Sequence, residues 1–243
     1  MPSISQLVRG LLPPRNGQPV MIVGMHRSGT SYLTGSLQAA GLELVSFSAW
    51  NPHNTKGNRE NQAIVDFHEK MLAARGCAWD IPPAGNVAWT EDEHREARDL
   101  IDTFRGHAVW GFKDPRALLF VEGWRELLPK LRFVGVFRHP DAVFRSLTAR
   151  GHQMTPGQVY ALWACYNQRL LALHRITEFP LLCFDDSEAV LHDKLNRVLR
   201  ALKLRELGNE RFFSSELRHH ASAEGALPAP IEAMYQSLKD LAL

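Results

Sequence analysis

The hydrophobic positions of the chain fall into two kinds of segment, short apolar runs and longer stretches with helical spacing. The short runs are rich in Val, Ile, Leu and Phe and predict buried strands at residues 20–24, 109–112, 133–137 and 181–184. Apolar residues three and four apart predict helices at residues 30–40, 60–74, 91–105, 124–128, 141–150, 156–175 and 187–204. Residues 42–45 are compatible with a further short strand. Because strands and helices alternate, the sequence predicts an α/β fold with a mostly parallel, doubly wound sheet.

Two of the predicted helices carry a specific start signal. Thr90 is followed three residues later by Glu93, and Thr155 is followed in the same way by Gln158. This is the spacing of a capping box, in which each side chain bonds the backbone N–H of the other residue. Residues 76–89 are instead rich in Pro and Gly and predict a loop.

Composition narrows the class of protein. The chain has 243 residues, of which 45% are hydrophobic and 22% charged, as is typical of one soluble globular domain. We expect a single domain over residues 1–243, with residues 1–18 as an N-terminal extension. The net charge is +2 and basic residues form no runs, which argues against nucleic acid as a partner.

The cysteines and the apolar segments give an expectation for the compartment. Cys77, Cys165 and Cys183 form neither a CxxC pair nor a disulfide framework, which favours a reducing environment. No segment has the roughly 18 apolar residues of a membrane span, and the N-terminus lacks the pattern of a signal peptide. The simplest expectation is a cytoplasmic protein.

The most informative motif follows the first predicted strand, where residues 20–31 read VMIVGMHRSGTS. A strand, a tight turn and a helix N-terminus together form an anion site, because the first N–H groups of a helix have no internal partner. Gly24 and Gly29 allow the backbone to approach a phosphate-like group closely. Further donors come from the side chains of Arg27, Ser28, Thr30 and Ser31.

The same motif departs from the nucleotide-binding pattern G-x-x-x-x-G-K-[ST] at one position. Gly24, Gly29 and Ser31 match, but Thr30 stands where the lysine belongs. That lysine reaches the terminal phosphates of a nucleoside triphosphate, so its replacement argues against an ATPase or a GTPase. An ordinary glycine-containing turn is the alternative to an anion site.

A second anion site is predicted at the end of the strand at residues 133–137. Arg138 follows that strand directly, Pro140 and Asp141 suit the first turn of a helix, and Ser146 lies eight residues after Arg138. In open α/β sheets, ligands bind beyond the carboxyl ends of strands. Arg27 and Arg138 both follow a strand, so we expect them to face one crevice. The alternative is a surface arginine at a strand end.

Together, these two segments resemble the sulfotransferases that use 3′-phosphoadenosine 5′-phosphosulfate (PAPS), and the arginine in the loop is more similar to their bacterial and Golgi-type branches. The resemblance runs over about residues 20–204. The first motif, R-S-G-T-S, is formed by Arg27, Ser28, Gly29, Thr30 and Ser31, and the second by Arg138, Pro140 and Ser146.

The resemblance implies a P-loop nucleotide-kinase-like fold and assigns the two motifs to the two ends of the donor. Residues 27–31 would hold the 5′-phosphosulfate, whereas Arg138 and Ser146 would hold the 3′-phosphate. PAPS has no γ-phosphate, so neither the missing lysine nor a metal ion is required. Among the catalytic residues, Arg27 is expected to stabilise the leaving phosphate.

Glu60 is the predicted general base. It lies four residues before Ile64 at the start of a predicted helix, which places it on the apolar face, and an inward carboxylate is costly unless it is paired or functional. The segment Lys56-Gly57-Asn58-Arg59-Glu60 also resembles a family K-G-x-x-E motif whose glutamate is the proposed base. The alternative is a first-turn acid that complements the helix dipole. His68, further along the same face, is expected to be packed or hydrogen-bonded.

Two further segments resemble family features. Lys113-Asp114-Pro115-Arg116 follows a predicted strand, and its Lys113 and Asp114 are expected to brace Glu60 or the acceptor, or else to form a local salt bridge. Arg218 lies in a C-terminal segment, residues 208–243, that resembles a loop closing over the nucleotide. Residues 76–108 are expected to form a lid or an acceptor-binding insertion.

These observations predict an enzyme that transfers a sulfuryl group from PAPS to a hydroxyl of a small molecule or a glycan, without a metal. Two alternatives remain. One is a small-molecule or nucleoside kinase with a degenerate phosphate loop, and the other is a non-catalytic nucleotide-binding scaffold.

Overall fold

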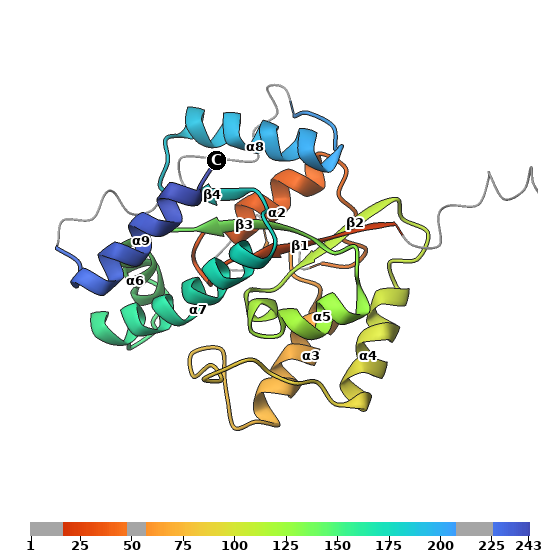
Figure 1. The fold of residues 1–243 in the computed structure, drawn as a ribbon, viewed down its shortest axis with the longest axis horizontal. Coiled ribbons are helices and arrows are strands. Elements are labelled where there is room, and N and C mark those ends of the chain that lie inside the picture. The colour runs from red at the N-terminus through yellow and green to blue at the C-terminus, as the bar shows by residue number, and fades with distance from the viewer. Residues whose placement is uncertain (1–16, 48–56, 208–225) are drawn as a thin grey trace, which may run out of the picture.

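In the computed structural model, residues 17–47, 57–207 and 226–243 are described. Within them, one four-stranded sheet has the strand order β2-β1-β3-β4, and all three neighbouring pairs are parallel (Figure 1). The strands are β1 (Gln18–Val23), β2 (Val109–Lys113), β3 (Arg132–Phe137) and β4 (Leu181–Cys183). The predicted α/β fold with a parallel sheet is confirmed.

Both faces of the sheet are covered by helices, because successive side chains of a strand point to opposite faces. Met21 and Val23 of β1 belong to one hydrophobic core, and Val20 and Ile22 belong to another. The first core includes α3 (Gln62–Ala73), α4 (Glu91–Asp102), α5 (Val121–Leu127), α6 (Pro140–Thr148), α7 (Pro156–Ile176) and α9 (Ala229–Leu241). The second core includes α2 (Thr30–Ala39) and α8 (Glu188–Leu202), which lie together on the other side of the sheet in Figure 1.

Both predicted capping boxes are present. Thr90 and Glu93 bond each other's backbone at the start of α4, and Thr155 and Gln158 do so at the start of α7. Residues 76–89 form a loop, as expected, with one isolated bridge between Ala78 and Ile81.

Several predicted elements are wrong in extent or were missed. The helix predicted from residue 60 begins at Gln62, because the Asn61 side chain accepts from the backbone N–H of Ala63 and caps it. The strand considered at residues 42–45 is a single bridge from Glu43 to β2. The 3-10 helix η1 (Pro115–Leu119) and the helix α9 were not predicted. β1 begins at Gln18, inside the predicted N-terminal extension.

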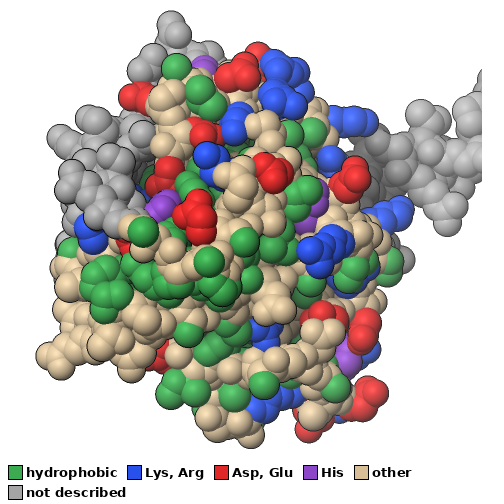
Figure 2. All heavy atoms as spheres, turned by 60° about the vertical axis from the view of Figure 1, so that its left-hand side comes forward, with side chains coloured by type: hydrophobic (Ala, Val, Ile, Leu, Met, Phe, Trp, Pro, Cys, Tyr) green, Lys and Arg blue, Asp and Glu red, His purple; other side chains and the backbone are tan. Residues whose placement is uncertain are grey.

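Two features concern the outside of the molecule. On the face shown in Figure 2, hydrophobic side chains gather across the middle, and acidic and basic side chains are interspersed around them. None of the helices in the described ranges combines the length and the apolar character needed to cross a membrane.

Candidate active site

The loop between β1 and α2 has the shape that its glycines predict. Gly24 has φ +156° and Gly29 has φ +92°, conformations that side chains rarely adopt. A Cβ at Gly24 would lie 2.3 Å from the Val136 carbonyl oxygen, and one at Gly29 would lie 2.3 Å from the Phe184 ring. Arg27 itself has φ 66°. The loop is therefore held tightly against the ends of β3 and β4.

The polar groups of this loop are arranged for an anion. Gly29 is the N-cap of α2 and offers no side-chain cap to its first N–H groups, so they are available to a ligand. Thr30, the first residue of α2, is buried. The Ser28 hydroxyl is fully buried and has no hydrogen-bond partner within the protein, so it can bond to a polar ligand.

Arg27 and the second predicted motif meet across the chain. Arg27 Nε donates to Ser146 Oγ at 2.9 Å, and Arg138 Nη1 makes a long contact of 3.5 Å to the Arg27 carbonyl oxygen. The structure thus brings Arg27, Arg138 and Ser146 together beyond the carboxyl ends of β1 and β3. Burial, followed by the positive charges of Arg150 and Arg138, lowers the pKa of Arg27. Such a cluster of cations is a favourable place for an anion.

Arg138 is held in position from three sides. Its carbonyl oxygen accepts from Trp163 Nε1 at 2.8 Å, and its guanidinium lies over the Phe184 ring at 5.2 Å. Asp185 Oδ1 lies 3.6 Å from Arg138 Nε, while Asp185 Oδ2 accepts from the backbone N–H of His139 at 2.6 Å. Asp185 was missed in the sequence, although it directly follows a predicted strand, the same positional signal that identified Arg138.

Glu60 and Lys113 form an ion pair on the other side of the loop. Lys113 Nζ donates to Glu60 Oε1 at 2.6 Å, and the exposed fraction of the side chain is 1% for Lys113 and 17% for Glu60. Glu60 precedes the N-cap of α3, so its predicted place on the apolar face of a helix is wrong. Its carboxylate points to Lys113, and the two residues before it both bond to α2.

Two contacts fix the segment that carries Glu60. Ser31 Oγ donates to the Asn58 carbonyl oxygen at 3.2 Å, and Arg59 Nη1 donates to Gln38 Oε1 at 2.8 Å. The predicted phosphate-loop residue Ser31 therefore also ties that loop to the segment of the predicted base.

Asp114 bonds to other residues than its neighbour Lys113 does. Asp114 Oδ2 lies 2.7 Å from His68 Nδ1, and Oδ1 accepts from Arg116 Nη1 at 2.7 Å. Trp124 Nε1 donates to His68 Nε2 at 3.0 Å, so His68 carries its proton on Nδ1 and donates it to Asp114. Burial acts to raise the pKa of Asp114, but the His68 hydrogen bond and the Arg116 charge hold that pKa below its usual value. Lys113 and Asp114 were both predicted to support Glu60 or the acceptor. Lys113 contacts Glu60, whereas Asp114 caps the start of η1.

His26, next to Arg27 in the loop, is a half-buried histidine. Both of its ring nitrogens are shielded from solvent and have no hydrogen-bond partner. Burial, and after it the charge of Arg116, lowers the pKa of His26 to about 3. The Trp79 ring lies over it, with the ring centroids 4.6 Å apart. His26 was not predicted as a site residue from the sequence.

Helix α7 holds the loop that contributes Trp79. Tyr166 Oη donates to the Trp79 carbonyl oxygen at 2.8 Å, and Arg169 donates to the carbonyl oxygens of Pro83 and Gly85. The predicted insertion at residues 76–108 thus touches the loop between β1 and α2 through Trp79. Its role in acceptor binding stays a prediction.

Two remaining expectations concern residues at the margin of the site. Arg218 lies outside the described residues. In the parts of the chain that the structure describes, no group of three or more His, Cys, Asp or Glu is arranged to hold a metal ion.

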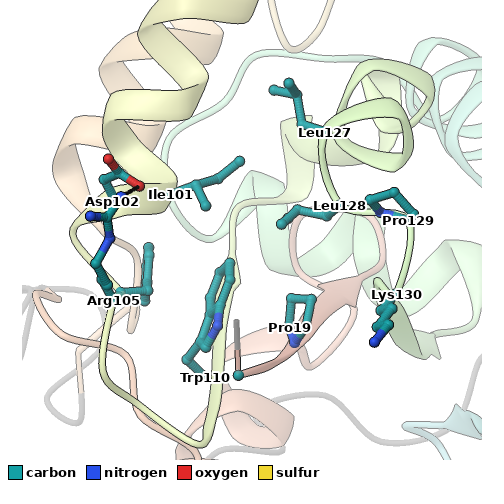
Figure 3. Close-up of a pocket in the computed structure, with 11 residues that line it drawn as sticks. Pro19, Ile101, Asp102, Arg105, Trp110, Leu127, Leu128, Pro129 and Lys130 are labelled. Carbon is teal, nitrogen blue, oxygen red and sulfur yellow. Dashed lines mark hydrogen bonds and ion pairs between the residues drawn. The ribbon is translucent and has the colours of Figure 1, made fainter. Parts of the chain in front are cut away.

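A separate cavity of about 600 Å³ lies at the opposite end of the sheet, where β1 and β2 begin (Figure 3). Pro19 and Trp110 line it from the strands, and Ile101, Leu127 and Leu128 line it from α4, α5 and the residue after α5. Because the phosphate loop follows the other end of β1, this cavity is not part of the candidate site.

Comparisons with solved structures give the same fold. The sulfotransferase domain of the Synechococcus PCC 7002 olefin synthase has a TM-score of 0.58 and 15% identity, over 93% of this chain and 96% of that chain. Sulfotransferase STF9 of Mycobacterium avium has a TM-score of 0.51 and 13% identity, over 92% and 76%. The sulfotransferase domain of the curacin biosynthetic pathway has a TM-score of 0.50 and 17% identity, over 86% and 80%.

The sequence itself places the chain in a family. A search of curated proteins found no significant match. The sequence model of the sulfotransferase family matches residues 19–205. This range is well over half of the chain and includes both predicted motifs. The chain therefore belongs to the sulfotransferase family.

Proposed function

We propose that this protein transfers a sulfuryl group from PAPS to a hydroxyl group of a small molecule or a glycan. The observation that carries the proposal is the contact between the two predicted anion-binding motifs. Arg27 of the first motif bonds Ser146 of the second at 2.9 Å, and Arg138 contacts the Arg27 backbone. A donor with phosphate groups at both ends of its ribose needs such a pair of anion sites.

The residues present suit the donor. The uncapped N-terminus of α2, the partnerless Ser28 hydroxyl and the cation Arg27 would receive the 5′-phosphosulfate. Arg138 and Ser146 would receive the 3′-phosphate. Thr30 in place of a lysine removes a group that a triphosphate requires, but PAPS has no γ-phosphate.

The chemistry requires a charge-stabilising group on one side and a base on the other. The bond between sulfur and the bridging oxygen of the 5′-phosphate breaks, and a new bond forms between sulfur and the acceptor oxygen. Arg27 and the loop N–H groups stabilise the charge that develops on the leaving phosphate. Glu60 takes the proton of the acceptor hydroxyl, and Lys113 holds the Glu60 carboxylate in place. The products are adenosine 3′,5′-bisphosphate and the sulfated acceptor.

The topology favours one direction of approach for the acceptor. In the strand order β2-β1-β3-β4, Arg138 follows β3 on one side of β1, whereas Lys113 ends β2 on the other side. If the 3′-phosphate lies at Arg138, the acceptor approaches from the β2 side, next to Glu60. Trp79 lies against His26 of the loop between β1 and α2, and Tyr166 of α7 holds it there.

Titration calorimetry separates this function from its alternatives. Wild-type protein is titrated with adenosine 3′,5′-bisphosphate without metal, and in parallel with ATP and Mg²⁺. We expect binding of the bisphosphate and little binding of ATP. Binding of ATP with Mg²⁺ alone would instead indicate a kinase.

A turnover assay separates the enzyme from a non-catalytic scaffold. Wild-type protein and Glu60→Gln are incubated with labelled PAPS and panels of sugars, phenols and hydroxylated lipids. We expect label transfer by the wild type and its loss in Glu60→Gln, with bisphosphate binding retained. The control is Glu96→Gln, because Glu96 also pairs with a lysine at 2.6 Å, but at the surface. Bisphosphate binding without transfer to any acceptor would favour a scaffold.

A further inference from the structure

The chain around Arg150 is connected to the loop between β1 and α2 on both sides, directly from the end of α6 and through Trp79 after it. Before Arg150, Ser146 Oγ accepts from Arg27 Nε at 2.9 Å. After it, the His152 ring contacts the Trp79 ring at 5.4 Å, and Trp79 lies over His26. Arg150 therefore lies between two contacts that both lead to adjacent residues of the loop.

The backbone explains why the chain stays close to the site after α6 ends. The Arg150 N–H and the His152 N–H both donate to the Leu147 carbonyl oxygen, at 3.0 and 3.3 Å, and Gly151 has φ +86°. This turn folds the chain back against the end of the helix. Arg150 follows Ser146 by four residues, which places the two on the same side of the helical turn.

The charges agree with this placement. After burial, Arg150 is the strongest influence that lowers the pKa of Arg27, and the carboxylate of Glu60 acts to raise the pKa of Arg150. The Arg150 guanidinium is therefore within electrostatic range of both Arg27 and Glu60.

In the proposed reaction, Arg150 lies near the path of the transferred group. The sulfuryl group travels between the leaving phosphate, assigned to Arg27, and the acceptor oxygen, assigned to Glu60. A cation within range of both lies beside that path. Lys113 reaches Glu60 from β2, whereas Arg150 comes from the end of α6, beyond β3. The site would then have cations on both sides of the transferred group.

We propose that Arg150 binds the peripheral oxygens of the sulfuryl group in the bound donor, as a second guanidinium beside Arg27. The inference rests on the proposed function. The peripheral oxygens of such a group carry the charge that the protein must stabilise during in-line transfer. An anion between Arg27 and Arg150 also relieves the repulsion between the two guanidinium groups.

Calorimetry with two nucleotides tests this role without an acceptor. PAPS carries the sulfuryl group, and adenosine 3′,5′-bisphosphate does not, so the ratio of their dissociation constants isolates contacts with that group. For Arg150→Gln we expect PAPS binding to weaken about tenfold, with bisphosphate binding changed less than about threefold. Arg150→Lys, which keeps the charge, should recover part of the PAPS affinity.

The matched control is Arg145→Gln, which removes the same charge five residues earlier, within α6. The charge of Arg145 lies near Tyr160, where it acts to lower the pKa of that phenol. We expect Arg145→Gln to leave the PAPS-to-bisphosphate ratio unchanged. If Arg150→Gln weakens both nucleotides equally, or neither, the proposal is wrong. If the wild type binds neither nucleotide, the proposed function fails first.

Discussion

At the scale of single residues, the Lys113–Glu60 ion pair is unequally buried, and this predicts unequal costs for its loss. Glu60→Leu leaves the Lys113 ammonium, whose side chain is 1% exposed, without its anion. Removing one partner of a buried pair costs about 3 kcal/mol or more. Lys113→Met leaves the Glu60 carboxylate, which is 17% exposed and can still be hydrated, so its cost should be smaller.

Urea denaturation of the two variants measures this difference. We expect the free energy of unfolding to fall further in Glu60→Leu than in Lys113→Met. Equal losses, or a larger loss in Lys113→Met, would show that the pair is not buried in this manner.

At the scale of elements, His68 links three of them. It lies on α3, donates to Asp114 at the end of β2 and accepts from Trp124 on α5. His68→Leu leaves a buried carboxylate and a buried indole N–H with one partner fewer, at a cost of about 3 kcal/mol. We expect thermal and urea unfolding to show this loss, with bisphosphate affinity retained because Arg27 and Arg138 are untouched.

A histidine on the neighbouring helix provides the comparison. His94 on α4 pairs with Glu126, whose side chain is 65% exposed, so His94→Leu should cost less than about 1 kcal/mol. A His68→Leu variant as stable as His94→Leu would mean that the buried network contributes little.

Local patterns predicted most of the elements, and tertiary contacts account for the rest. The strands and the caps at Thr90 and Thr155 are set by neighbouring residues, which is why the sequence predicts them. The start of α3 was wrong by two residues because Asn61, rather than the apolar spacing, sets it. Helix α9 was missed, although Ile231, Met234 and Leu238 pack against the core from one face.

The candidate site divides in the same way. The meeting of Arg27, Arg138 and Ser146 could be predicted because strand ends and fixed spacings identify these residues. The partners that orient them could not, since Asp185 reaches Arg138 only through the register of β3 with β4. The Trp79 contact with His26 likewise depends on how α7 holds a loop without regular structure.

At the scale of the whole molecule, the lowered pKa of His26 predicts how the free energy of unfolding changes with pH. Its pKa is about 3 in the folded protein, against 6.5 for an ordinary histidine. Below pH 6.5 the unfolded chain takes up a proton that the folded protein does not, so stability falls with pH until about pH 3. Between pH 7.5 and pH 5 this one group should remove about 2 kcal/mol.

Between pH 7.5 and pH 5, Asp114 does not contribute to this change in stability. The pKa of Asp114 is lowered from 3.8, so its contribution is lost only as the pH falls through about 4 and below. Urea denaturation at pH 7.5 and pH 5 should therefore show a smaller pH effect in His26→Gln than in the wild type. An identical pH effect in both would show that His26 takes up a proton in the folded protein.

The proposed donor site is tested most directly by asking whether Arg138 binds the 3′-phosphate of the nucleotide. Wild type and Arg138→Ala are titrated with adenosine 3′,5′-bisphosphate and with adenosine 5′-monophosphate, which lacks the 3′-phosphate. We expect the wild type to prefer the bisphosphate and Arg138→Ala to lose about 2 kcal/mol of that preference, roughly thirtyfold, with monophosphate affinity little changed. A wild type that binds both nucleotides equally, or a preference that survives in Arg138→Ala, would contradict it.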